Sequence, residues 1–157
     1  MDRGVLESIR KLLQTTRVLS LAYVTETGAE VALLPFVPRE DCAAVYVQAS
    51  ALARHTQALG PGARVGVLVH EQDGPATDPM QLARLSVEAT VSVFDKESAA
   101  YDTAAAQFAG RFRAARLTLG LGDFNLYTLT LGGGRFVEGF ARAFDIPPEA
   151  FAEIGRL

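Results

Sequence analysis

The sequence has few of the residues that build disulfides and metal centres. Its 157 residues include one cysteine, Cys42, and two histidines, His55 and His70. A single cysteine forms no intramolecular disulfide and cannot build a thiolate metal site alone. The two histidines lie far apart in the chain, without the short spacing of paired zinc ligands. We therefore expect no zinc or iron held by protein ligands alone.

Charge of either sign is not in large excess, and neither sign gathers in a tail. Fifteen basic residues stand against eighteen acidic ones, for a formal net charge of −3. That balance gives no footprint for nucleic acid or an anionic membrane. Asp2, Arg3 and Glu7 interrupt the start of the sequence, so it lacks a signal-peptide pattern, and the apolar runs are too short to span a bilayer. These absences predict a cytoplasmic protein without nucleic-acid or membrane partners.

Length and composition are those of an ordinary globular domain. Hydrophobic residues make up 49% of the chain and charged residues 21%. A chain of this length buries roughly two-thirds of its unfolded surface around one core. We find no internal repeat, low-complexity tract or linker. The expectation is a single domain over residues 1–157.

Hydrophobic spacing predicts mostly strands, with helices inserted between them. The expected elements are an opening amphipathic helix that ends at Thr15-Thr16, a hairpin of 18–24 and 31–37, a strand at 44–49, a helix at 51–59, strands at 64–70 and 82–94, a helix from about 96 to 114, a final hairpin of 124–131 and 135–141 around the glycines 132–134, and a closing helix from Pro147. No regular βαβ alternation is present. The order favours a closed or partly closed antiparallel barrel with peripheral helices.

Two residues within predicted strands do not fit a plain sheet. Pro35 cannot donate a hydrogen bond to a ladder, so it should lie at an edge, at a bulge or against something other than a strand. Arg84 belongs to the polar face of the 82–94 strand, whose other face is apolar. A buried isolated charge is costly, so Arg84 should either face solvent or meet an anion.

The segment Ser50–Thr56 is the most informative for function. Ser50 stands where a strand ends and a helix is expected to begin, so its hydroxyl could cap the helix while free N–H groups attract a phosphate. Arg54 lies four residues further on the same predicted face and could bind phosphate oxygens. The alternative is an ordinary capped helix with a solvated arginine. His55, between Leu52 and Leu59 in helical spacing, reads more simply as a packed residue.

Hydrolase and dinucleotide-binding motifs are missing. The aspartates are scattered over loops without a paired-carboxylate pattern, and no G-x-S-x-G elbow occurs. The glycines 132–134 lack the strand, fingerprint and helix order of a Rossmann loop. A hairpin turn explains them better.

Several segments together point to a known family. They are LLPFVP at 33–38, the stretch 50–59, Asp78-Pro79 with LARL at 82–85, GDFNLY at 122–127 and RFVEGFAR at 135–142. In this order, from about Val5 to Phe144, they resemble the motifs of the pyridoxamine 5′-phosphate oxidase-like FMN-binding split barrels. The branch they resemble most includes the HugZ-like haem-utilisation proteins.

The resemblance implies a fold, a partner and a cofactor site. The fold would be a mainly β, Greek-key-like antiparallel split barrel with peripheral helices (α+β), and the protein a homodimer with FMN in grooves between its subunits. The side chains implied for FMN are Leu33, Leu34 and Pro35 at the flavin ring, Ser50, Arg54, His55 and Thr56 at the phosphate, Arg84 at either, and Phe140 and Arg142 from the opposite subunit.

The sequence also departs from the resembling proteins. The neutral LLPFV stretch replaces basic residues of the pyridoxamine-phosphate oxidases, and their C-terminal arginine-histidine motif is missing, so vitamin oxidation is not expected. Haem-degrading relatives supply a haem-ligating histidine from a longer C-terminal part, whereas here no histidine follows His70. Glu138 replaces a usual glycine and brings acidic charge near the expected cleft.

Three functions from different classes stay open at this point. The resemblance favours an FMN-dependent oxidoreductase of unknown substrate. The alternatives are a haem-binding or haem-degrading protein on the same barrel and a non-catalytic flavin-binding module. No catalytic side chain is assigned, because a flavin carries the redox chemistry itself while the protein binds and orients it.

Overall fold

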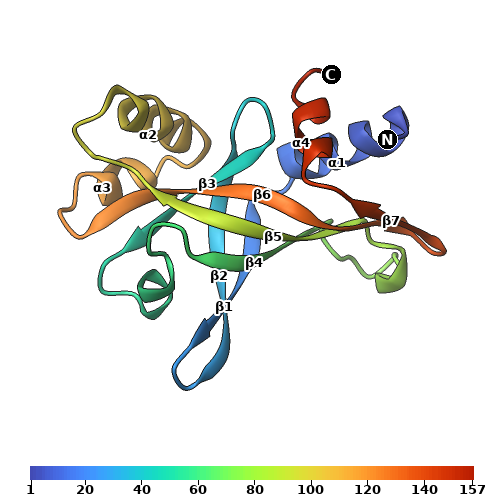
Figure 1. Cartoon of the computed structure of the whole chain (residues 1–157), viewed down its shortest axis with the longest axis horizontal. Helices are drawn as coiled ribbons and strands as arrows, with labels where there is room; N and C mark the ends of the chain where they lie inside the picture. The colour runs from blue at the N-terminus through green and yellow to red at the C-terminus, as the bar shows by residue number, and fades with distance from the viewer.

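Seven strands form one antiparallel sheet, and six of them close into a barrel (Figure 1). The computed structural model describes residues 1–157, and its strands are β1 Val18–Thr25, β2 Gly28–Pro38, β3 Ala44–Ser50, β4 Arg64–His70, β5 Arg84–Val93, β6 Phe124–Gly139 and β7 Arg142–Ile146. Their order is β3-β2-β1-β4-β5-β6-β7, and pairing of β3 with β6 closes the ring. The mainly β antiparallel barrel expected from the sequence is confirmed.

The barrel is filled by the inward residues of strands that alternate in polarity. On β5, Leu85, Val87 and Ala89 are buried, while Ser86 and Glu88 face outward. This period of two follows from the pleat of a strand, which points successive side chains to opposite faces. The strand predicted at 82–94, with one apolar and one polar face, is therefore confirmed.

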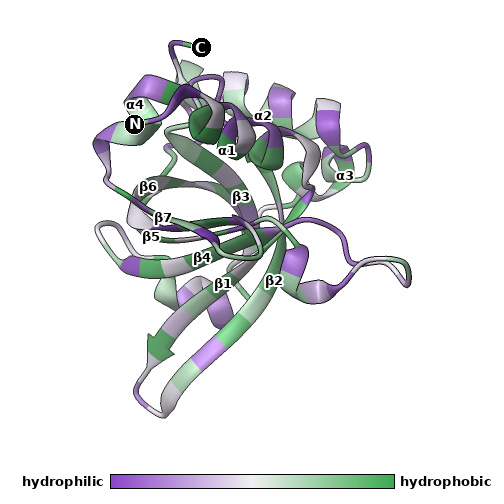
Figure 2. Cartoon of the chain, turned by 90° about the vertical axis from the view of Figure 1, so that its right-hand side faces the viewer, coloured by the Kyte–Doolittle hydropathy of each residue, from purple (hydrophilic) through white to green (hydrophobic).

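Helices cover one end of the barrel, and the β1–β2 hairpin extends from the other (Figure 2). Helix α1, Arg3–Thr15, begins at Asp2, whose carboxylate accepts hydrogen bonds from the N–H groups of Gly4 and Val5. Its apolar stripe is buried against the barrel. The other helices are α2 Ala99–Arg111, α3 Ala115–Leu119, α4 Glu149–Ile154 and the short 3₁₀ helices η1 Arg54–Ala58 and η2 Pro79–Gln81. No helix is long and apolar enough to cross a membrane.

Pro35 lies at a position of β2 where no backbone N–H is needed for strand pairing. The N–H of Phe36 donates to the carbonyl of Arg17, so the nitrogen of Pro35 points away from β1. On that side β2 pairs with β3 only through Phe36–Pro38. Pro35 therefore lies just beyond the end of the β2–β3 ladder, where its nitrogen faces no paired residue, in agreement with the expectation that it does not donate to a ladder.

The predicted hairpin around the glycines 132–134 is wrong. These glycines lie within β6, a single strand of 16 residues, and the reversal follows at Gly139–Arg142. There Gly139 has φ 148° and Ala141 φ 61°. The glycines serve a close approach instead, because a Cβ on Gly134 would lie 2.1 Å from the carbonyl oxygen of Ser86. Sequence reasoning assigned them to a turn because glycine serves both purposes.

The helix predicted at 51–59 is also wrong. A turn follows β3, and only the 3₁₀ helix η1 forms, with Ala53 before it and no side-chain cap. The reason is that the Ser50 carbonyl accepts from the backbone N–H of Ala53 and from the hydroxyl of Thr56, which ties the segment into a tight turn. The helix expected from about 96 to 114 ends at Arg111 and is followed by the separate α3.

The close approach at Gly134 is testable by adding a single methyl group. Gly134→Ala would place Cβ against Ser86 and Val87, so it should lower the free energy of unfolding by about 1–3 kcal/mol or more. Gly133→Ala is the matched control, because its nearest neighbours lie at 3.4 Å. Urea unfolding measures both. Equal stability of the two variants would show that β5 and β6 can separate at no cost.

Candidate functional site

An unusually apolar surface covers the outside of the β1–β2 hairpin. In the register of the two strands, Val18 lies opposite Pro35, Ser20 opposite Leu33, Ala22 opposite Val31 and Val24 opposite Ala29. We call these eight outward residues the outer face. Val24 is 79% exposed, Val31 71% and Leu33 68%. Contiguous exposed apolar surface of this kind marks a ligand or partner site more often than a plain exterior.

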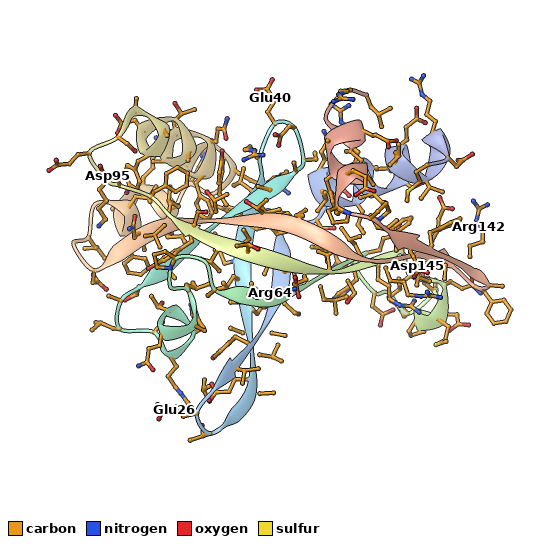
Figure 3. The ribbon with its side chains drawn as sticks, in the orientation of Figure 1. Glu26, Glu40, Arg64, Asp95, Arg142 and Asp145 are labelled. Carbon is orange, nitrogen blue, oxygen red and sulfur yellow. The ribbon has the colours of Figure 1, made fainter.

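Small side chains make the outer face concave where it meets β4. Gly66 lies beside Ala22, whose Cβ would be 3.2 Å from a Cβ on that glycine. A groove of about 460 Å³ runs here between Val24, Val31 and Gly66. The ion pair of Arg64 with Glu88 lies at its edge, and Figure 3 shows Arg64 beside the ribbon of β4.

Three of the residues implied for the flavin site flank or belong to this surface, and one does not. Leu33 and Pro35 are part of the outer face. Arg84 lies on β5 opposite His70 of β4, is half-buried and donates to the Leu82 carbonyl. Leu34 instead points into the barrel and is 5% exposed. Since neighbours on a strand point to opposite faces, Leu33 and Leu34 cannot line the same side.

The hydroxyl groups of the expected phosphate site already have partners. Ser50 Oγ donates to Asp123 Oδ2 at 2.6 Å and accepts from the N–H of Leu52 at 3.1 Å. Thr56 Oγ1 donates to the Ser50 carbonyl at 2.5 Å. Asp123 also places a carboxylate beside Ser50. These contacts are those of a structural turn.

Arg54, the expected cation of this site, forms an ion pair with Glu30. Glu30 also accepts from the hydroxyl of Tyr23 at 3.0 Å. The Arg54 side chain is 78% exposed, so the pair lies at the surface. Arg54 borders a cleft of about 510 Å³ together with Val24 and Gln57. A phosphate in this position would have to compete with a carboxylate.

The side chain of His55 is packed against the protein rather than exposed to solvent. Its Nε2 is buried and has no hydrogen-bond partner, and burial lowers the pKa of the ring. The neighbouring Leu59 is fully buried. The interpretation of His55 as a packed residue agrees with this geometry.

Phe140 and Arg142 lie at a third place, the β6–β7 turn. Phe140 is 72% exposed, and its N–H donates to Gln81 Oε1 at 3.2 Å. Arg142, the first residue of β7, pairs with Glu138 at 2.7 Å, and Figure 3 shows it beside β7. Glu138 also accepts from Ser8 at 2.5 Å, so its charge is compensated locally. Within one chain, the expected residues therefore form three separate groups.

Sequence reasoning missed Val24 and Val31 at this surface, and it considered His70 only as one of two histidines that could ligate a haem, without placing it here. The sequence does contain a signal for this surface. In the segments 18–24 and 29–35 both sets of alternating residues are mainly apolar, whereas in β5 only one set is apolar. A strand with two apolar faces is covered on both. In this structure the second face of the β1–β2 hairpin is exposed.

Comparison with known proteins places the chain in a family. No protein-family model matches the sequence. The haem oxygenase HutZ of Vibrio cholerae is 30% identical over 158 residues, which cover 99% of this chain and 89% of that protein. The chain belongs to the HugZ-like branch of the pyridoxamine 5′-phosphate oxidase-like split barrels.

Solved structures agree with this split-barrel assignment. A crystal structure of HutZ, described as a haem storage protein, has a TM-score of 0.72 and 25% identity over 89% of this chain and 93% of that one. A haem-binding protein from Mycobacterium smegmatis has a TM-score of 0.84 at 21% identity over 98% of this chain, which spans 62% of that protein. A pyridoxinephosphate oxidase family protein from Clostridium acetobutylicum has a TM-score of 0.70 at 10% identity over 96% of this chain and 99% of that one.

Acidification should destabilise this split barrel through His55. Because burial lowers its pKa, the folded protein binds the proton less readily than the unfolded chain, whose histidines titrate near about pH 6.5. The contribution of the neutral ring is complete above that pH and is lost as the pH falls through the folded pKa. Urea unfolding between about pH 7.5 and 5 should show this loss in the wild type and not in His55→Phe. An equal loss in both would assign it to other groups.

Proposed function

We propose that the protein binds haem on the outer face, between two copies of the chain. The observation that carries this proposal is the exposed apolar surface of the β1–β2 hairpin. Haem is a large planar group whose ring buries apolar area while its two carboxylates stay at one edge. The outer face consists mainly of valine, alanine, leucine and proline, and Arg17 and Arg84 lie beyond its end at Val18. This combination suits the distribution of apolar and charged groups in haem. The relatedness to HutZ, which is named a haem oxygenase, supports the same reading.

A second copy of the chain would complete such a site. One barrel leaves Val24, Val31 and Leu33 more than two-thirds exposed. Covering a side chain of this kind fully is worth about 1.5–3 kcal/mol. A planar ligand on one face has its other side in water unless another surface covers it. A homodimer with facing outer faces supplies that cover, in agreement with the partner expected from the sequence.

The iron of bound haem supplies redox and small-ligand chemistry, and the protein supplies its orientation and the exclusion of water. An oxygenase activity, as in the name of the V. cholerae relative, would be a further property of the same complex. It would appear as loss of the Soret band when a reductant and dioxygen are added. Haem storage or transfer would leave that band intact.

The proposed site is tested by a charge on the outer face. We expect the wild type to sediment as a dimer and Leu33→Glu as a monomer. The same substitution should weaken haemin binding by about 10-fold or more, because a carboxylate would be buried against apolar surface. Leu52→Glu is the matched control, since Leu52 is 86% exposed and lies outside the outer face. Sedimentation velocity and Soret titration measure the two effects. A wild-type monomer that binds haemin stoichiometrically would refute the intersubunit site.

FMN binding is the second candidate function. The split-barrel fold shared with the pyridoxinephosphate oxidase family protein favours it. The contacts at Ser50 and Arg54 oppose it, because the hydroxyls are already used and two carboxylates lie beside the expected phosphate. An FMN that bound here would displace Glu30 from Arg54. Reduction of bound flavin by NADH or NADPH would separate an oxidoreductase from a non-catalytic flavin module.

A comparison of FMN with riboflavin tests this candidate. If Arg54 holds the phosphate, Arg54→Ala should weaken FMN binding by about 10- to 100-fold, the equivalent of a charged hydrogen bond of about 1.5–3 kcal/mol. Riboflavin should bind both proteins equally. Glu30→Gln should act in the opposite sense and strengthen FMN binding, since it frees the guanidinium. Fluorescence quenching measures the affinity of the wild type, Arg54→Ala and Glu30→Gln for each flavin. Equal FMN affinity in wild type and Arg54→Ala would place the phosphate elsewhere.

A further inference from the structure

His70 has the hydrogen-bond arrangement of a metal-binding histidine. Its Nδ1 lies 2.6 Å from the carbonyl oxygen of Glu71. A carbonyl oxygen only accepts, so Nδ1 carries the hydrogen and donates it. In the neutral ring Nε2 then holds a free lone pair. Histidines that bind metals commonly donate their other ring N–H to a carbonyl in this way, which fixes the tautomer and the ring direction.

The register of the sheet places His70 at the end of the outer face. His70 pairs with Arg84 of β5, which pairs in turn with Val137 of β6. On the other side, Val18 and His70 each lie two residues beyond Ser20 and Leu68, the last pair of the β1–β4 ladder. His70 and Val18 border the same cavity of about 440 Å³. The imidazole is exposed and adjoins the apolar surface proposed above for haem.

The charges around His70 are mixed. Arg17, Glu71 and Asp73 border the same cavity, and the Arg17 guanidinium lies 5.1 Å from the centre of the Phe112 ring. Arg84, directly opposite on β5, makes no ion pair within the chain and donates only to the Leu82 carbonyl. Its guanidinium is therefore available to a carboxylate that approaches along the outer face.

The second histidine of the chain lacks these features. The Nε2 of His55 is buried with no partner, so no external ligand reaches it unless η1 moves away from the barrel. Of the two histidines in the sequence, only His70 combines an exposed ring, a fixed tautomer and contact with the outer face.

We propose that Nε2 of His70 ligates the iron of haem bound at the outer face, an inference that rests on the haem binding proposed above. Arg84, on the next strand, pairs with a haem carboxylate. The iron ligand then comes from the last residue of β4. The pairing of β4 with its neighbouring strands would therefore set the position of the iron.

The test is a spectroscopic comparison of four full-length proteins after addition of haemin: wild type, His70→Gly, His55→Ala and Arg84→Gln. We expect the wild type to show a Soret band and, when reduced, the iron–histidine stretching band in resonance Raman spectra. His70→Gly should lose that band and bind haemin at least about 10-fold more weakly. Imidazole in solution should restore the band, because it fills the space left by the side chain.

The two other variants are controls for the iron ligand. His55→Ala should keep the iron–histidine band, and Arg84→Gln should keep it while its affinity for haemin falls, because Arg84 acts on the carboxylates. A wild-type band unchanged in His70→Gly would overturn the assignment of His70 and leave haem binding standing. A wild type without a stoichiometric Soret band would overturn the proposed function, and the ligand with it.

Discussion

The pairing of β5 with the second half of β6 depends on one close approach between backbones, that of Gly134 on β6 to Ser86 and Val87 on β5. A side chain at this position would meet the Ser86 carbonyl oxygen at 2.1 Å. Because the approach is allowed, β6 runs for 16 residues, pairing first with β3 and β5 and then with β5 and β7. The register shift between Val87 and Ala89 lies at the same point. This shift therefore lies between the part of β6 that pairs with β3 and the part that pairs with β7.

Once the barrel is closed, its inside takes one apolar face from each of its six strands. The outward faces then differ. On β5 they carry serine and glutamate, which water solvates, whereas on β1 and β2 they carry valine, alanine and leucine. The outer face is therefore apolar surface left over after the core is complete. Because burial of this surface would be favourable, it is the basis of the haem binding and the dimer proposed above.

Haem and FMN make different demands on this surface. Both present a flat ring, but FMN adds a phosphate dianion that needs donors free of competing acids. At Ser50 and Arg54 the donors are engaged and Asp123 and Glu30 are close. Haem adds carboxylates and an iron, for which Arg84 and His70 lie side by side in the sheet register. The polar groups beside the apolar surface are therefore the reason that haem, rather than FMN, is proposed as its ligand.

The sequence by itself determined most of the elements and the family. Period-two spacing defined β5, β-prone runs around turn residues indicated β1 to β4, and helical spacing defined α1, because these features depend on residues close together in the chain. For Pro35 the sequence left an edge, a bulge or a contact other than a strand open, because proline cannot donate to a ladder. The role of Gly134, the turn after Ser50, the inward direction of Leu34 and the pairing of His70 with Arg84 were decided only by the tertiary structure. Each depends on which strand lies beside which, and strand pairing joins residues that are distant in sequence, so no local pattern records it.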